Sequence, residues 1–451
     1  MQSADNPGIR SLSSQLIRKE LTSTQIVEQR LDRARGAEGV FTALNESVLA
    51  AAQEADRRRR DGVAGVLEGI PVTLKDLYNV QGQVTLAGSR VLQKSARKES
   101  ADAAVVAHLR QAGLLFLGRT NMSEFAFSGM GLNPHYPPLL SVWDRATGRL
   151  PGGSSSGSAV SVALGIVPGT LGSDTAGSCR IPAAFNGIVG VKPSYGRLSL
   201  DGVVPLSPSS DAPGPLGVDV DTCFILDHLM AGAYDGSLPD LRDAAPDDVK
   251  LVIPAGIVMS DLDSEVAMAF ERAVGLIAEA GFSIDSTPMP VVDDCVTMFL
   301  ERPVVPFEAW RDHKDRLMAH GDEYDPYVKQ RMSNGQHVSA EEQDSRYRHK
   351  AELIARFNRS FDAGGASALI YPTVACIPPA VSGTMDPERI GGINLRCLRN
   401  TATVNYFDGC AISLPCHRDG EAPVGLMLAM PHGHDPSLYA LANSLEKILR
   451  R

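Results

Sequence analysis

The sequence predicts an α/β fold, and two observations lead to this expectation. Short apolar runs that fit buried strands alternate with amphipathic stretches that fit helices, which is typical of α/β proteins. The chain has 451 residues, of which 43% are hydrophobic and 21% are charged, so it can build one large core. No internal repeat or low-complexity tract divides it. We therefore expect a single domain over residues 1–451.

The N-terminal segment, residues 1–62, is expected to be helical. Thr22 and Gln25 have the spacing of a capping box, which predicts a helix start at this point. A second helix is expected at about 48–60. Its arginine run, 57–60, is partly neutralised by nearby acidic residues, so we interpret it as a solvated helix end.

Residues 63–230 are expected to form the core of the domain. Thr120 to Phe125 is predicted to start a helix, 129–140 is predicted to be a loop, and 173–178 a tight loop after a strand. The remaining expected elements are strands at 69–74, 114–117, 167–171 and 189–192, and helices at 101–112 and 157–164.

Residues 231–248 are polar and rich in turn-forming residues, and we interpret them as a connector between two halves of one domain. The second half covers 249–451. Asp435 and Pro436 are predicted to cap and start the last helix. The other expected elements are strands at 251–254, near 283, and at 368–372, 411–415 and 424–430, and helices at 264–280 and over most of 308–359.

Composition excludes several classes of function. The formal net charge of −10 argues against nonspecific binding of nucleic acid or of an acidic membrane. The longest apolar stretch, 159–171, contains Pro168 and is too short to span a bilayer. The N-terminus has no signal-peptide layout, and the seven cysteines show no CxxC spacing. We therefore expect a cytoplasmic protein without nucleic-acid or membrane partners.

Two glycine-serine blocks and one lysine carry the candidate chemistry. The blocks are GGSSSGSA at 152–159 and GSDTAGS at 172–178, and Lys75 follows the apolar run 69–74. Serines and a lysine embedded in glycine can make a nucleophile that works without histidine. The alternative is that these blocks are ordinary turns or a phosphate cradle, although no GxxxxGK[ST] motif is present.

Three motifs resemble the amidase signature family of serine hydrolases: GIPVTLKD at 69–76, GGSSSGSA at 152–159 and GSDTAGSCRIPAAFNGIVGVKPS at 172–194. The resemblance implies a mixed central sheet covered by helices on both faces. It also implies hydrolysis of a small-molecule carboxamide through an acyl-enzyme, with no cofactor and no metal. It is weakest over 290–365, which we expect to be a variable, substrate-side region.

The resemblance implies a role for each member of a triad. Ser178 is the nucleophile, Ser154 relays the proton, and Lys75 is the base; the Gly153–Ser154 peptide bond is expected to be cis. A lysine base must be neutral, which costs about 4–5 kcal/mol at pH 7 unless burial supplies it. Asp76 opposes this unless it points to the opposite face of the strand. Ser155 is expected to hold the remaining hydrogen bonds of the lysine.

The resemblance also assigns supporting roles. Asp174 and Arg180 are expected to form a buried pair that braces the nucleophile loop. The substrate pocket is expected to draw on Gly129, Met130 and the 300–400 region. The backbone N–H groups expected to form the oxyanion hole belong to Thr175, Ala176, Gly177 and Ser178. The family usually has glycine where this chain has Ala176, and this methyl group is expected to narrow the acyl side of the pocket.

Two alternatives to a free-standing amidase remain open. One is the glutaminase subunit of a tRNA-dependent amidotransferase, and the other is a catalytically silent binding protein. In the glutaminase branch an acidic residue holds the amino group of glutamine, and that position falls here on Leu398. The neighbouring Arg396 and Arg399 are expected to suit a carboxylate or a carbonyl-rich substrate. The stretch also resembles the allophanate-hydrolase branch.

Two further expectations concern partners and metal. Family members often dimerise, so a homodimer is possible. The sequence His432-Gly433-His434-Asp435 contains metal-ligand types, but no HExxH motif or carboxylate set accompanies it, so we interpret it as a loop before the last helix.

Overall fold

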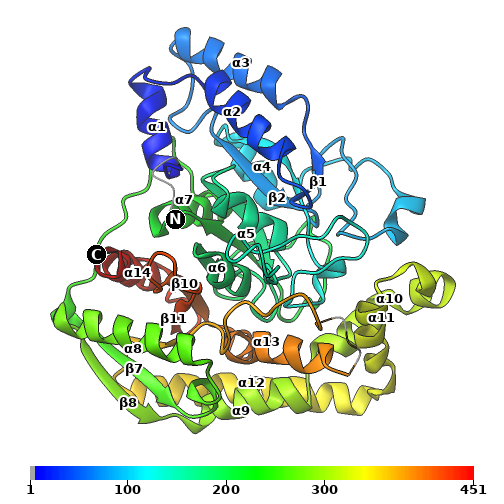
Figure 1. The fold of residues 1–451 in the computed structure, drawn as a ribbon, viewed down its shortest axis with the longest axis vertical. Coiled ribbons are helices and arrows are strands. Elements are labelled where there is room, and N and C mark those ends of the chain that lie inside the picture. The colour runs from blue at the N-terminus through cyan, green and yellow to red at the C-terminus, as the bar shows by residue number, and fades with distance from the viewer. Residues whose placement is uncertain (1–5, 385, 387, 451) are drawn as a thin grey trace.

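The computed structural model describes residues 6–384, 386 and 388–450. Within these residues one eleven-stranded sheet runs through the molecule, in the order β1-β3-β2-β4-β6-β5-β10-β11-β9-β7-β8 (Figure 1). This confirms the predicted α/β class. The strands are β1 Phe41–Leu44, β2 Pro71–Lys75, β3 Leu115–Thr120, β4 Gly169–Asp174, β5 Val189–Lys192, β6 Ala212–Gly217, β7 Lys250–Ala255, β8 Ser283–Pro288, β9 Ala368–Pro372, β10 Cys410–Pro415 and β11 Gly425–Met430.

The sheet is mixed, as the family resemblance implied. Strand β2 pairs in parallel with β3 and β4, and β7 pairs in parallel with β8 and β9. The centre is antiparallel, because β6 pairs with β4 and β5, and β10 pairs with β5 and β11. Strand β10 from the second half of the chain therefore lies beside β5 from the first half. The connector at 231–248 joins two halves of one sheet.

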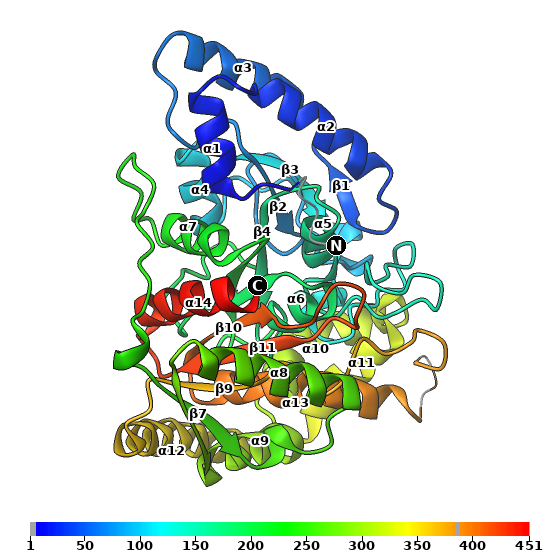
Figure 2. The ribbon, with the colours of Figure 1, turned by 60° about the vertical axis from the view of Figure 1, so that its left-hand side comes forward.

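Side-chain alternation along the strands separates the two faces of the sheet. In β9, Ala368 and Ile370 pack into one core cluster while Leu369 and Tyr371 pack into another. The first cluster includes residues of α7, α8 and α14, and the second includes residues of α6, α9, α12 and α13. Helices thus cover both faces, and α3 and α12 lie at opposite ends of the molecule (Figures 1 and 2).

The helix predictions can be compared with the observed bounds. Helix α2 begins with the predicted capping box between Thr22 and Gln25, and α3 runs over the predicted residues. No helix of the described residues is both long enough and apolar enough to cross a membrane. The helices are α1 Ile9–Ile17, α2 Ser23–Arg35, α3 Val48–Arg60, α4 Ala104–Gln111, α5 Ser156–Ala163, α6 Arg180–Asn186, α7 Val220–Met230, α8 Ser264–Glu279, α9 Pro290–Glu301, α10 Val305–His320, α11 Pro326–Ser333, α12 Ala340–Gly364, α13 Ile390–Tyr406 and α14 Asp435–Leu449.

Three local predictions were wrong. Thr120 ends β3, and the predicted helix reduces to a 3₁₀ turn at Glu124–Ala126. The Glu124 carboxylate is buried and accepts hydrogen bonds from the hydroxyl of Ser89 and the backbone N–H of Asp325, which hold this segment in place. Strand β4 continues through Asp174, so the loop is shorter than expected.

The third error concerns the last helix. Asp435 does not cap it; its carboxylate accepts hydrogen bonds from the backbone N–H and the hydroxyl of Ser194. The side chain that was expected to close a helix end instead joins the start of α14 to the segment after β5.

Gly157, in the first turn of α5, has no room for a side chain. A Cβ atom at this position would lie 2.3 Å from the carbonyl oxygen of Val40 and 2.6 Å from the backbone nitrogen of Asn121. We expect Gly157→Ala to destabilise the protein by about 1–3 kcal/mol, because backbone atoms must move apart. The melting temperature, followed by circular dichroism, measures this loss.

The matched control is Gly275→Ala. Gly275 is also helical, but nothing lies within 4 Å of the position of its Cβ atom. Alanine should be neutral there, or should stabilise the helix by up to about 1 kcal/mol. Equal melting temperatures for the two variants would contradict the close approach at Gly157.

Candidate active site

Lys75 is the centre of the candidate site. It is the last residue of β2, and its side chain is fully buried. Its Nζ lies 2.7 Å from the Oγ of Ser154 and 2.7 Å from the Oγ of Ser173. The structure therefore brings Lys75 and Ser154 together, as expected. The other contact corrects an expectation, because Ser173 and not Ser155 holds the second hydrogen bond of the lysine.

Burial shifts the protonation equilibrium of Lys75 towards the neutral amine. Burial lowers the pKa of Lys75 to about 8, and the charges of Asp174 and Asp211 act in the opposite direction. Burial raises the pKa of the neighbouring Cys179 thiol, so this thiol is uncharged when the lysine titrates. The two carboxylates are thus the negative charges that oppose the loss of the proton.

Asp76 points away from Lys75, as strand alternation allowed. Its carboxylate accepts a hydrogen bond from the Nε of Arg119 at 2.6 Å and from the backbone N–H of Gly88 at 3.1 Å. Both side chains of the Asp76–Arg119 pair are buried. The carboxylate adjacent in sequence to the lysine is therefore neutralised by a cation of its own.

The serine blocks meet at the end of β4. The Gly153–Ser154 peptide bond is cis, as the resemblance implied. The backbone N–H of Ser155 donates to the carbonyl of Ser178 at 3.2 Å, which joins the two blocks. The Ser178 hydroxyl lines a cavity and has no hydrogen-bond partner among the described residues. It is free to meet a ligand.

Three of the four expected oxyanion donors remain available. The N–H groups of Thr175, Ala176 and Ser178 have no acceptor within the described part of the chain. The N–H of Gly177 differs, because it donates to the Oδ1 of Asp174 at 2.8 Å. In this conformation the N–H of Gly177 helps to hold the loop in place, and it is not available to a ligand.

Asp174 and Arg180 form the expected buried brace. The guanidinium donates to both carboxylate oxygens at 2.9 and 3.0 Å, and both side chains are fully buried. Burial alone would raise the pKa of Asp174, but Arg180 and the backbone N–H of Cys179 hold it at about 2. The hydroxyl of Thr401 in α13 binds the carbonyl of Ala176 at 2.7 Å and fixes the other side of the loop.

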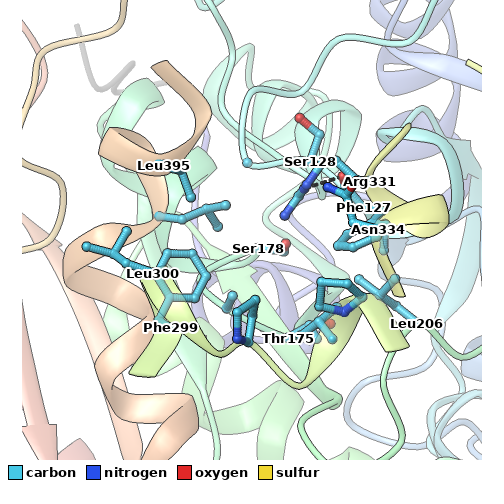
Figure 3. Close-up of a pocket in the computed structure, with 17 residues that line it drawn as sticks. Phe127, Ser128, Thr175, Ser178, Leu206, Phe299, Leu300, Arg331, Asn334 and Leu395 are labelled. Carbon is cyan, nitrogen blue, oxygen red and sulfur yellow. Dashed lines mark hydrogen bonds between the residues drawn. The ribbon is translucent and has the colours of Figure 1, made fainter. Parts of the chain in front are cut away.

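A cavity of about 150 Å³ opens over Ser178 (Figure 3). Both halves of the chain contribute to its walls almost equally, and the second half does so through residues 299–398, close to the expected 300–400 region. Ala176 lines the cavity, and Leu398 lies in its wall, where the glutaminase branch is expected to have an acidic residue. None of the described residues that line it carries a carboxylate. The second-half residues in its wall are Phe299, Leu300, Pro303, Val305, Pro306, Arg331, Asn334, Leu395 and Leu398.

Among the described residues that line this cavity, Arg331 of α11 is the one with a cationic side chain, and in Figure 3 that side chain points towards the space above Ser178. Its guanidinium lies 4.0 Å from the centre of the Phe127 ring and donates to the Phe127 carbonyl. No carboxylate among the described residues pairs with it. Burial lowers the pKa of Arg331, so its charge is poorly solvated.

Several expected substrate contacts lie elsewhere. Gly129 lines the cavity, but Met130 packs with Leu150 and Ile390 in a separate apolar cluster. Arg396 and Arg399 also lie outside the cavity lining. Arg396 pairs with Asp263 at 2.9 Å, and Arg399 donates to the carbonyl of Ser260 at 2.7 Å. The expected contact of these two arginines with the substrate was wrong, because α13 turns them away from Ser178.

Sequence reasoning missed Ser173, Thr401 and Arg331. Ser173 lies two residues before Thr175 inside a recognised motif, so it could have been considered. Thr401 and Arg331 lie in helical stretches without local signatures. Only the fold brings them close to Ser178. Within the described residues, no group of three or more His, Cys, Asp or Glu side chains could hold a metal ion.

The mixed α/β fold and a cavity lined by Ser178, with Lys75 hydrogen-bonded to Ser154 nearby, fit a hydrolase of amide C–N bonds. A family model described as "Amidase" matches residues 23–439, so the chain belongs to the amidase family. A glutamyl-tRNA(Gln) amidotransferase subunit from Syntrophobacter fumaroxidans is 32% identical over 97% of this chain and 96% of its own length.

Two further comparisons support this assignment. The 2-amino-5-chloromuconic acid deaminase of Comamonas testosteroni is 34% identical over 85% of this chain and 82% of its own length. The crystal structure of an amidase superposes with a TM-score of 0.87 at 30% identity, covering 98% of this chain and 99% of the other.

Proposed function

We propose that this chain is a free-standing amidase that hydrolyses a carboxamide bearing a carboxylate, through an acyl-enzyme on Ser178. The observation that carries the chemistry is the 2.7 Å hydrogen bond between the buried Nζ of Lys75 and the Oγ of Ser154, beside the cavity that Ser178 lines. Lys75, Ser154 and Ser178 are all present in this arrangement, which argues against a catalytically silent binding protein. The site needs no cofactor for this reaction.

The proposed reaction has two halves. Neutral Lys75 takes a proton from Ser154, which takes one from Ser178, while the Ser178 Oγ attacks the amide carbon. The N–H groups of Thr175, Ala176 and Ser178 stabilise the oxyanion. The proton then returns through Ser154 to the departing nitrogen, so the C–N bond breaks and the acyl group stays on Ser178. Water, activated by the same base, releases the acid.

Arg331 supports a substrate that carries a carboxylate. A poorly solvated guanidinium without an acidic partner binds an anion strongly, because the ligand replaces lost solvation. The absence of a carboxylate from the described lining argues against glutamine, whose ammonium group would have no counter-ion there. The Comamonas relative is named for a substrate that is an acid, which agrees with this substrate class.

The nucleophile is tested by covalent labelling. We expect a fluorophosphonate to modify wild-type protein at Ser178, and Ser178→Ala to abolish both labelling and amide hydrolysis, by about 10⁴-fold or more. Peptide mass spectrometry identifies the labelled residue. Ser156→Ala, in the other glycine-serine block, is the control and should be labelled like wild type. Labelling at another serine would contradict the assignment.

The base is tested by the pH dependence of kcat/KM. Activity should rise as pH increases through about 8, because only neutral Lys75 accepts a proton, and Lys75→Met should remove most of it. Lys192 is a matched control, since burial lowers its pKa to about 8 as well, and it binds the carbonyls of Pro193 and Gly409. Lys192→Met should leave unchanged the pH at which kcat/KM rises, which is the acid limb of the profile. A profile that is flat from pH 6 to 9 would exclude a lysine base.

The carboxylate preference is tested by two arginine variants on paired substrates. Arg331→Met should lower kcat/KM for a carboxylate-bearing amide by about 10- to 100-fold, and should have little effect on the matching neutral amide. Arg399→Met, which removes an arginine outside the cavity, should change neither rate. Equal losses on both substrates would remove Arg331 from recognition. Efficient glutamine hydrolysis, alone or with amidotransferase partner subunits, would overturn the free-standing amidase.

A further inference from the structure

The hydroxyl of Thr175 makes a contact that the proposed reaction has not used. It donates to the Oδ1 of Asp211 at 2.6 Å, and both side chains are buried. Asp211 directly precedes β6, and the antiparallel register pairs Asp174 with Ala212, so the sheet places Asp211 opposite Thr175. Thr175 is the first residue of the oxyanion loop, defined as residues 175–178, which carry the proposed oxyanion donors. The hydrogen bond of Thr175 ties this loop to the residue before β6.

The second carboxylate oxygen of Asp211 holds the wall of the cavity. The Oδ2 accepts the backbone N–H groups of Leu206 and Ser207, each at 2.9 Å, and Leu206 lines the cavity. Backbone N–H groups can only donate, so this set of partners fits an ionised carboxylate. One side chain thus connects the oxyanion loop to the segment that faces the substrate.

A second buried carboxylate extends the connection. Glu308 of α10 accepts hydrogen bonds from the hydroxyls of Ser207 and Tyr347 and, at 3.3 Å, from the backbone N–H of Ser209. The first turn of the same helix supplies Val305 and Pro306 to the cavity wall. The network therefore runs from the substrate-side helix to Thr175.

The charge of Asp211 is not cancelled by a nearby cation. Among the described residues no lysine, arginine or histidine forms an ion pair with it. The titratable groups that interact with its charge are Lys75, Tyr78, Tyr195 and Glu308. Asp174 also acts on Lys75, but Arg180 neutralises that carboxylate directly.

We propose that Asp211 is a positioning residue of this active site: it fixes Thr175, ties the oxyanion loop to the cavity wall, and places a negative charge that acts on Lys75. The inference rests on the proposed function. Two separate effects follow. The hydrogen bond orients the N–H group of Thr175 for the oxyanion. The charge favours the protonated lysine, so it sets the pH at which the base becomes active.

The variant Asp211→Asn distinguishes the two effects, on the Thr175 N–H and on the protonation of Lys75, from a merely structural role of Asp211. An amide can offer its oxygen to the N–H groups of Leu206 and Ser207, but its NH₂ group then faces the Thr175 hydroxyl and must donate to it. The side chain is isosteric and uncharged. Thr175→Val removes only the hydroxyl and leaves the charge of Asp211 in place. The two variants therefore predict different pH profiles.

The measurement is the rate of fluorophosphonate labelling of Ser178 as a function of pH, in the full chain. We expect Asp211→Asn to slow labelling by roughly tenfold or more and to move the acid limb to lower pH, because loss of a negative charge lowers the proton affinity of Lys75. Thr175→Val should slow labelling without moving the limb. Glu446→Gln changes a buried carboxylate that accepts a hydrogen bond from Val220 in another part of the fold, and it should do neither.

Each outcome decides the inference. A wild-type protein that is not labelled overturns the proposed function and this inference with it. A labelled wild type combined with an unmoved or raised limb in Asp211→Asn overturns the inference alone. If circular dichroism shows that Asp211→Asn does not fold, Thr175→Val decides, because labelling at the wild-type rate would exclude positioning through that hydroxyl.

Discussion

The constraint on which this structure depends is the removal of the Lys75 amine from water. A charged ammonium loses its hydration at this position, and the two hydroxyls 2.7 Å away replace only part of it. Any further negative charge beside the amine would restore the protonated form. The carboxylates near the lysine must therefore be turned away from it or paired with a cation of their own. Asp76 is turned to Arg119 on the other side of the strand, and Asp174 is held by Arg180.

The same constraint explains the density of small residues around the site. Lys75 can be buried only if strands and the start of α5 approach closely, and at Gly157 the backbone of Asn121 leaves no space for a Cβ atom. The loop after β4 is fixed by hydrogen bonds and not by bulky side chains. Asp174 accepts the N–H of Gly177, and the hydroxyl of Thr401 in α13 donates to the carbonyl of Ala176. Glycine and serine serve this purpose because they allow close contact and still supply hydrogen-bonding groups.

Local signals in the sequence predicted a large part of this molecule. The capping box of α2, the bounds of α3 and the apolar runs of β5 and β9 depend on neighbouring residues, and they were located well. Strand β6 was missed because Pro213 and Pro215 lie inside it, yet it pairs with both β4 and β5. The proposed triad positions followed from motifs. Ser173 lies inside a recognised motif, although its contact with Lys75 was not predicted. Arg331 and Asp211 have no local signature, because their contacts lie far away in the sequence.

The two halves of the chain contribute different residues to the site, and the shared sheet holds these residues together. Lys75, Ser154 and Ser178 come from the first half of the chain, whereas Phe299, Leu398 and Arg331 come from the second. Because β5 and β10 are hydrogen-bonded neighbours, the cavity walls of the second half are held against Lys75, Ser154 and Ser178 without belonging to the same segments. Under the proposed function, changes in α9, α11 or α13 would alter which amide is bound while the environment of Lys75 stays intact. The Asp211 network is an exception, since it connects a substrate-side helix to the oxyanion loop. A change at Glu308 could consequently reach the chemistry through Ser207 and Asp211, although Glu308 is not among the described residues that line the cavity.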